Sequence, residues 1–203
     1  MVLAQSPAFR RPLVTLLVGL FGLVLAGCGY NNVPTLEEKA KAAWGEVQNQ
    51  YQRRADLIPN LVETVKGFAE QERKVLTDVV EARAKATQTK LPDDILTNPE
   101  AFQKFQQAQS QLSGALGRLL VVVERYPDLK SNQNFLTLQS QLEGTENRIA
   151  IARRDYIESV RIYNTEIRTI PGRWWRALLY PDAQPLETFT VEPETTKLPK
   201  VKF

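Results

Sequence analysis

The chain has 203 residues, of which 26 are Lys or Arg and 23 are Asp or Glu, so its formal charge at pH 7 is +3. This balance is too even for a protein that binds nucleic acid by neutralising phosphates, and no nucleic-acid partner is expected. The chain contains no His and one Cys, which excludes zinc sites, Cys-His or Ser-His catalysis and intrachain disulfides. With 43% apolar and 24% charged residues, it has the composition of one globular domain.

The first 27 residues have the order of an export signal. Arg10 and Arg11 are the only charged residues before Glu37, and the uncharged run at 12–27 follows them directly. As a helix this run would reach about 24 Å, which is short of the ~30 Å hydrocarbon core of a bilayer. We therefore expect residues 1–27 to be a signal peptide. An uncleaved membrane anchor is the alternative, because a short apolar run can span a thinned bilayer.

The leader ends in Leu25-Ala26-Gly27-Cys28, which resembles the lipobox of bacterial lipoproteins. This resemblance implies that the Cys28 thiol carries a lipid. Membrane lipid is therefore an expected partner of the protein, through the acylated Cys28. It also implies a lipid-anchored membrane protein of the bacterial cell envelope, with its helical domain outside the cytoplasm. A single-pass membrane protein is the alternative. Cleavage would remove Arg10 and Arg11 and lower the formal charge from +3 to +1.

Residues 28–34 are expected to be a short linker to a helical domain at 35–170. Thr35-Leu36-Glu37-Glu38 has the form of a capping box, which predicts that a helix begins there. Downstream, apolar residues recur at seven-residue spacing on two lines that together form one stripe along a helix. These lines comprise Ala40, Val47, Leu61, Phe68, Val75 and Ala82, and Trp44, Tyr51, Ile58, Val65 and Val79, and they are interrupted by Arg54 and Glu72.

Two arguments disagree about the first helix at Pro59. The stripe continues through Pro59, which predicts one long kinked helix, since a Pro removes one backbone hydrogen bond without necessarily ending a helix. A helix over 36–83 would measure about 72 Å, however, against about 42 Å for the next helix at 99–126. A break near Pro59 would give four segments of matched length. We expect the kink, because residues 56–60 are too apolar for an exposed turn.

Two further helices follow. Asn98-Pro99-Glu100 places an N-cap, a first-turn Pro and a first-turn acid in the favoured order, which predicts a helix from there to Tyr126-Pro127. A third helix follows the turn at 127–129 and runs to Ile170-Pro171-Gly172. No alternating strand pattern appears between the turns. The predicted fold class is therefore all-α: an antiparallel up-and-down bundle of three long helices, or four if the first is broken near Pro59.

Two C-terminal segments differ from the helical domain. Residues 171–180 form a short aromatic and basic segment with Arg173, Trp174, Trp175 and Arg176, a mixture that settles at membrane–water interfaces. An aromatic cap on the end of the bundle is the alternative. Residues 181–203 contain several prolines and no helical period, so we expect an extended tail that is mobile unless something binds it.

The end of this tail is a candidate binding segment for an unidentified envelope protein. Pro199 favours an extended backbone, which loses less entropy on docking, and the apolar side chains offer anchors. These candidate partner-binding residues are Leu198, Pro199, Val201 and Phe203.

Two stretches of the chain, 53–68 and 142–154, resemble the signature segments of the LemA family. They read RRADLIPNLVETVKGF and LEGTENRIAIARR, and the similarity extends from about Tyr30 to Phe203. This resemblance implies a membrane-anchored bacterial envelope protein whose domain is similar to an up-and-down four-helix bundle. It implies no catalytic activity. Cys28 is a departure, since many similar proteins look like simple single-pass membrane proteins.

Four carboxylates are candidates for a metal site. Glu63, Glu72, Glu143 and Glu146 could line a bundle core as in carboxylate-bridged metal proteins, but the usual histidines are missing. Ion pairs with nearby arginines explain these acids more simply, so we expect no catalytic residue, metal or cofactor. The expected function is a noncatalytic scaffold or adaptor for another envelope protein. The alternative is a bundle that carries a small ligand or metal as accessory to an enzyme.

Overall fold

The computed structural model describes residues 29–88 and 91–190. The helices are α2 (Asn32–Lys66), the short 3-10 helix η1 (Glu70–Glu72), α3 (Arg73–Gln88), α4 (Pro99–Val123), α5 (Pro127–Lys130), α6 (Gln133–Glu166) and α7 (Gly172–Leu179). No strand occurs in these two ranges, and the predicted all-α class is confirmed. The candidate residues Cys28, Leu198, Pro199, Val201 and Phe203 lie outside the described part of the chain.

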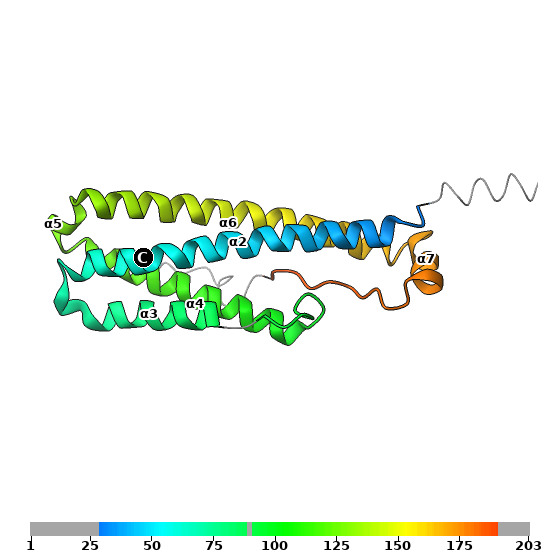
Figure 1. Ribbon diagram of the computed structural model, residues 1–203, viewed down its shortest axis with the longest axis horizontal. Helices are drawn as coiled ribbons and strands as arrows, with labels where there is room; N and C mark the ends of the chain where they lie inside the picture. The colour runs from blue at the N-terminus through cyan, green and yellow to red at the C-terminus, as the bar shows by residue number, and fades with distance from the viewer. Residues whose placement is uncertain (1–28, 89–90, 191–203) are drawn as a thin grey trace, which may run out of the picture.

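Two long antiparallel helices, α2 and α6, pack side by side along the long axis of the bundle (Figure 1). Their 35 and 34 residues correspond to about 52 and 51 Å at 1.5 Å per residue. The shorter α3 and α4 pack against each other and extend along the end that carries α5. At the other end the chain after α7 runs back along the bundle. The bundle therefore has four helices over only part of its length.

The structure shows where the first predicted helix is continuous and where it ends. As expected, α2 continues through Pro59, but the single helix to Arg83 is wrong, because α2 ends at Lys66. After Gly67 the backbone leaves helical geometry at Ala69, whose φ and ψ are −133° and 51°. Ala69 itself is buried, so the turn packs on the core. The break that gives four helices thus lies at 67–69 rather than at 56–59.

An arginine on the neighbouring helix replaces the backbone bond that Pro59 removes. In a regular helix the N–H of residue 59 would donate to the carbonyl oxygen of Ala55, and Pro59 has no N–H. Instead, Nε of Arg83 on α3 donates to this oxygen at 2.8 Å. Ala55 is buried, so an unpaired carbonyl there would be costly. The helix can pass through Pro59 because α3 satisfies the carbonyl from outside.

A side-chain cap marks the start of α4 but not that of α2. The start of α2 lies at Asn32, three residues before the predicted Thr35, so residues 32–34 are helical and not linker. Val33 explains this, because it is buried and holds the first turn on the core. The predicted start of α4 is confirmed, since the Asn98 side chain accepts a hydrogen bond from the Ala101 N–H at 3.1 Å.

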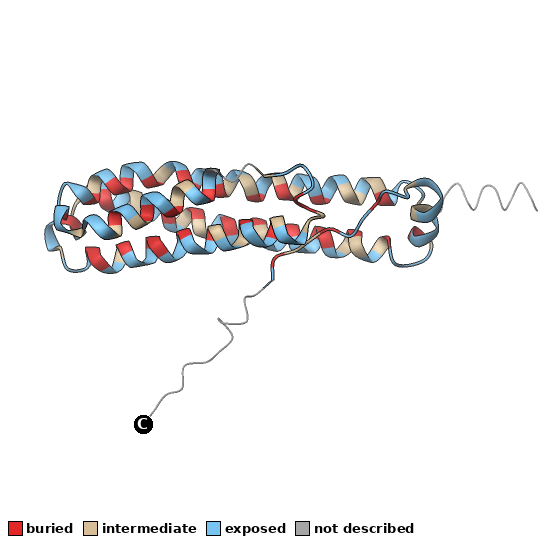
Figure 2. Cartoon of the chain, turned by 90° about the horizontal axis from the view of Figure 1, so that it is seen from below, coloured by how far each residue is buried: buried red, intermediate tan, exposed pale blue. Residues whose placement is uncertain are grey.

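The buried apolar side chains form two clusters along the bundle axis. The cluster towards α7 is rich in aromatic rings, and Trp44 lies 5.2 Å from Phe105 and 5.3 Å from Tyr156 between ring centroids. The cluster towards α5 is largely aliphatic and includes Ile58, Leu112 and Leu142. Figure 2 shows the buried positions as a stripe on the inner face of each helix.

The expectation of a mobile tail is wrong for residues 181–190, which we call the strap. The strap is extended as predicted, but Ala183, Leu186 and Phe189 are buried in the aromatic cluster. Asn164 on α6 donates to the Leu186 carbonyl and accepts from the Leu186 N–H, both at 2.9 Å. The strap is therefore part of the core at the end where α3 is absent (Figure 2).

The role of Arg83 is tested by a double-mutant cycle with Pro59. We expect Arg83→Met to lower the free energy of unfolding by about 1–2 kcal/mol, because it leaves the buried Ala55 carbonyl unpaired. In a Pro59→Ala background the restored N–H supplies this bond, so the same substitution should cost clearly less. Urea unfolding followed by circular dichroism measures both values. The matched control is Arg73→Met, which changes an exposed α3 arginine whose ion-pair partner among the described residues is Glu70. Equal costs of Arg83→Met in the two backgrounds would contradict the assignment.

Candidate functional site

A polar layer crosses the core between the two apolar clusters. Arg54 of α2 is only 1% exposed, and Gln109 of α4 and Thr145 of α6 are also buried. On each helix the layer falls between a residue of the aromatic cluster and one of the aliphatic cluster, as Arg54 does between Tyr51 and Ile58. The three helices thus each contribute one polar position to the same level of the bundle.

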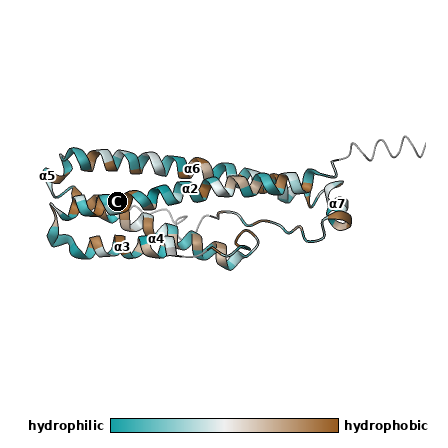
Figure 3. Ribbon diagram, viewed as in Figure 1, coloured by the Kyte–Doolittle hydropathy of each residue, from teal (hydrophilic) through white to brown (hydrophobic). Residues whose placement is uncertain are grey.

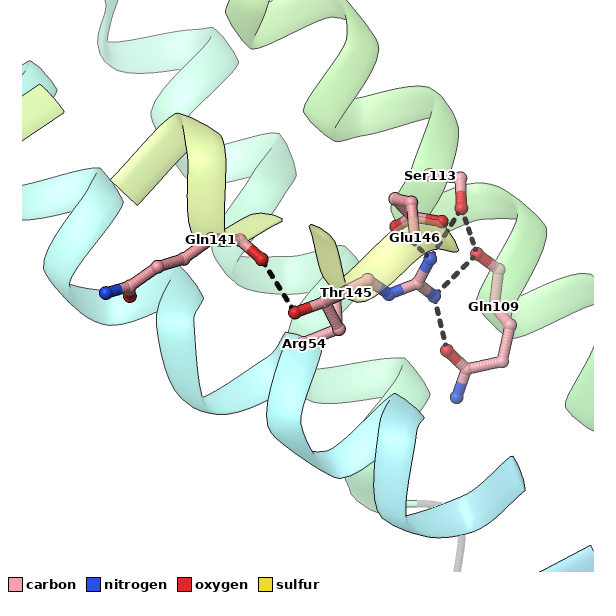
Figure 4. A network of polar contacts seen from close by, with 6 residues as sticks. All are labelled: Arg54, Gln109, Ser113, Gln141, Thr145 and Glu146. Carbon is pink, nitrogen blue, oxygen red and sulfur yellow. Dashed lines mark hydrogen bonds and ion pairs between the residues drawn. The ribbon is translucent and has the colours of Figure 1, made fainter. Parts of the chain in front are cut away.

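The Arg54 guanidinium connects α2 to both α4 and α6 (Figure 4). Its NH1 group donates to Ser113 Oγ and to Glu146 Oε1, both at 2.8 Å. Its NH2 group donates to Gln109 Oε1 at 2.7 Å and lies 3.4 Å from the Gln109 carbonyl oxygen. The Nε atom is buried and has no hydrogen-bond partner among the described residues. Arg54 also lies over the ring of Tyr51, at 5.0 Å from the centroid.

This arrangement fixes helix register. A buried guanidinium is tolerated only when its charge is paired and its donors are used, and here the partners come from two other helices. Glu146 is 44% exposed, so water reaches one end of the ion pair. The Thr145 hydroxyl is satisfied within α6, where it donates to the Gln141 carbonyl at 2.8 Å. Sliding α4 or α6 by one turn would separate Arg54 from its partners.

A cleft of about 380 Å³ lies beside the polar layer, between α4, α6 and the end of the strap. Arg54, Arg153 and Glu146 supply its charged groups, and Ile149, Ile157 and Phe189 supply apolar surface. Arg153 is half-buried and lies over the Phe189 ring at 4.2 Å. Burial raises the pKa of the Tyr51 hydroxyl in this wall, and the two arginines partly offset that rise.

The acidic residues considered for a metal site do not come together. Glu146 is bound to Arg54, whereas Glu72 pairs with Arg125 at 2.9 Å. Glu143 accepts a hydrogen bond from Gln139 on its own helix, and Glu63 lies 3.9 Å from Lys66. Within the described ranges no cluster of three or more Cys, Asp or Glu residues is placed to hold a metal ion. Ion pairing thus accounts for Glu63, Glu72 and Glu146, and an amide contact for Glu143.

A second candidate site is the end of the bundle formed by α7. Arg173 and Trp174 are exposed, whereas Trp175 and Arg176 are half-buried. Arg176 faces the strap, since its Nε donates to the Ala183 carbonyl at 2.7 Å. The four predicted membrane-interface residues therefore divide into an outward and an inward pair. Gly172 allows the tight entry to α7, because a Cβ there would overlap the Glu166 carbonyl.

Exposed apolar side chains gather around α7. Trp174 and Leu178 are 62% and 73% exposed, and Ile170, Leu179 and Tyr30 are also exposed. Figure 3 shows the hydrophobic colour on α7 at this end of the molecule. The first residue of α2 lies beside the same end, since Asn32 Nδ2 donates to Glu166 Oε1 at 3.4 Å. Among the described helices none combines the length and hydrophobicity of a membrane span.

The sequence pointed to one of these sites and missed the other. The aromatic and basic composition at 173–176 identified α7 as a candidate interface. The polar layer had only one signal, the interruption of the apolar stripe by Arg54. Its partners Gln109 and Ser113 carry no motif, and the pairing of Arg54 with Glu146 joins residues 92 positions apart.

The fold and the polar layer define an antiparallel helical-bundle protein with a charged group built into its core. The chain belongs to the LemA family, whose model matches residues 43–203. The match contains both stretches that resemble the family, and Arg54 of the first stretch forms an ion pair with Glu146 of the second.

The chain is also similar to magnetosome proteins. It is 27% identical over 161 residues to magnetosome proteins MamQ 1 and MamQ 2 of Paramagnetospirillum magneticum. It is 26% identical over 158 residues to magnetosome protein MamQ of Magnetospirillum gryphiswaldense. These matches cover 71% and 70% of this chain and 59% and 58% of the respective relatives, so the chain spans less than two thirds of their length.

The polar layer predicts an asymmetric response to mutation. Glu146→Ala leaves the buried Arg54 charge without its carboxylate, and we expect a loss of about 1–2 kcal/mol in unfolding free energy, moderated by the exposure of Glu146. Replacing both residues, as Arg54→Met with Glu146→Ala, should recover most of this loss, because the charge is removed as well. Denaturant unfolding gives the values. Glu143→Ala is the control, because Glu143 is exposed and its hydrogen bond in the described part of the chain is to the Gln139 amide of its own helix. A double variant less stable than Glu146→Ala would overturn the account.

Proposed function

We propose that this protein is a noncatalytic, membrane-anchored envelope protein whose bundle serves as a scaffold or adaptor for another envelope protein. Membership of the LemA family supports this proposal, as does the leader with its basic start and apolar run. The similarity to magnetosome proteins supports a role at a membrane. The anchor is a lipid on Cys28, with an uncleaved membrane span at 12–27 as the alternative.

The observation that carries the proposal is the position of α7 at the end where α2 begins. Gly29, Tyr30 and Asn31 alone separate Cys28 from Asn32, and four peptide steps span at most about 15 Å. The exposed Trp174 and Leu178 and the cation of Arg173 therefore lie close to wherever the anchor enters the bilayer. Indole, aliphatic and guanidinium groups together favour the interfacial region, where rings face acyl chains and cations reach headgroups.

The scaffold role is supported by what the bundle offers to other proteins. Its buried side chains form two apolar clusters, to one of which the strap contributes, so we assign partner binding to exposed surface and to the chain beyond the bundle. Exposed apolar residues such as Val121 and Ile151 lie along the helices rather than at the α7 end. Leu198, Pro199, Val201 and Phe203 remain the candidate partner-binding residues of the C-terminus.

Membrane contact of α7 is tested with the full chain in vesicles that contain anionic lipid and lipids brominated near the headgroup. We expect quenching of Trp174, with the buried Trp44 as an unquenched internal reference. Trp174→Ala should remove most of the quenching, whereas Val121→Ala, an exposed apolar site on α4, should not change it. The intact mass of the same sample shows whether Cys28 carries lipid and whether residues 1–27 are removed. Unquenched Trp174 would leave α7 as an aromatic cap.

The adaptor role is tested by deleting Pro199–Phe203. We expect the thermal midpoint to stay within error, because the two apolar clusters are already built from residues between Val33 and Phe189. In-cell crosslinking followed by mass spectrometry should then show the loss of an envelope protein captured by the full chain. A large fall in the midpoint would show that the segment packs on its own bundle. An unchanged set of captured proteins would remove these residues from the partner interface.

A further inference from the structure

The helix α7 depends on the rest of the bundle for its shape. It has eight residues, and isolated helices shorter than about 12 residues are marginal in water. The amides of its first turn are bonded to the preceding chain, since the Arg173 N–H donates to the Thr169 carbonyl at 2.7 Å and the Trp174 N–H donates to the Pro171 carbonyl at 2.9 Å. The helix also packs against α2. Contacts from outside α7 thus keep these residues helical.

Arg176 ties the last turn of α7 to the strap. Its Nε donates to the Ala183 carbonyl at 2.7 Å, and the Ala183 N–H donates to the Tyr180 carbonyl at 3.0 Å. Ala183 is buried in the aromatic cluster, so the bond from Arg176 joins α7 to the core. Burial and the Glu37 carboxylate raise the pKa of the Tyr163 hydroxyl to about 12, and the charge of Arg176 partly offsets this rise. Arg176 therefore faces the bundle.

The exposed apolar face of α7 lies opposite Arg176. At 3.6 residues per turn, side chains two positions apart point about 200° apart around the helix axis. Arg176 is two positions from both Trp174 and Leu178, which are four positions apart and share one face. Both of these side chains are exposed. Holding Arg176 against the strap therefore turns the face with Trp174 and Leu178 away from the bundle.

We propose that Arg176 is a positioning residue, which holds α7 in the orientation that presents Trp174 and Leu178 to a bilayer. This role rests on the proposed membrane contact of α7, and it means that the contact surface is formed before the membrane is met. A short segment that becomes helical only at a membrane loses conformational freedom on binding, whereas a preformed helix does not. The exposed Arg173 reaches headgroups, and Arg176 acts through α7 without touching lipid.

The positioning role is tested by hydrogen–deuterium exchange and mass spectrometry on the full chain in a nonionic detergent, which has no headgroup charge. We expect the amides of residues 177–180 to exchange more slowly than in a synthetic peptide of residues 169–182 in the same detergent. Arg176→Gln should raise their exchange rate about fivefold, the factor that corresponds to about 1 kcal/mol for one hydrogen bond. Arg176→Lys should restore slow exchange, because a Lys ammonium can donate to the same carbonyl.

The matched control on the same helix is Arg173→Gln. Arg173 is exposed, and Arg, Lys and Gln have similar helix propensities, so these substitutions change contacts rather than intrinsic helicity. Arg173→Gln should leave the exchange of residues 177–180 unchanged, and the amides of α2 and α6 should be unaffected in every variant. Equal exchange in Arg176→Gln and the unaltered chain would overturn the proposal. Peptide-like exchange of α7 in the unaltered chain would also overturn it.

Vesicles distinguish positioning from direct headgroup binding. The quenching by brominated lipid that Trp174→Ala removes reports on the contact of α7, and anionic lipid should increase this quenching relative to zwitterionic lipid. Arg173→Gln should reduce the increase, because one cation near an anionic surface is lost, whereas Arg176→Gln should preserve it. Equal reductions would make Arg176 a headgroup ligand and overturn the proposal. Absence of quenching in the unaltered chain would contradict the proposed membrane contact, whereas unchanged exchange in Arg176→Gln would contradict the positioning role alone.

Discussion

The buried charge of Arg54 is the constraint on which the arrangement of the helices depends. A guanidinium at 1% exposure must be neutralised and hydrogen-bonded, and its partners Gln109, Ser113 and Glu146 come from two other helices. Apolar contacts specify helix register less strictly, because one aliphatic side chain can take the place of another in the interface when a helix shifts along its partner. The polar layer permits one register, and it divides the core into an aromatic and an aliphatic half.

The two halves differ because their helices have different lengths. On the α5 side, α3 completes a four-helix arrangement and also sustains α2 through the bond from Arg83 to Ala55, one residue after Arg54. On the α7 side there is no α3, and the long α2 and α6 would expose their inner faces. The strap covers them, with Leu186 and Phe189 in the place of a helix side chain. The aromatic rings suit this half, since large side chains fill the wider space beside an extended segment.

The sequence predicted what depends on local pattern. The class, the path of the helix through Pro59 and the start of α4 at Asn98 follow from periodicity and capping chemistry. The end of α2 at Lys66 was missed because the apolar stripe continues across the turn, where Phe68 keeps the seven-residue phase although it is exposed. The strap was missed because a period of three in a proline-containing segment resembles a free tail until a partner surface is known. The polar layer depends on contacts between distant residues that no local signal contains.

The position of α7 does not depend on which kind of anchor the protein has. The family match begins at Ala43, so it includes the polar layer, α7 and the strap but not the leader. Family membership therefore supports the bundle and leaves the anchor to the chemistry of residues 1–28. A lipid on Cys28 and an uncleaved span at 12–27 both deliver the chain to Asn32 from the same side. Because Asn32 is held next to the end of α6 by its bond to Glu166, the start of α2 lies at the same end of the bundle as the exposed Trp174 and Leu178. The fold alone therefore determines that α7 and the start of α2 share one end of the bundle, and the proposed membrane contact of α7 is compatible with either anchor.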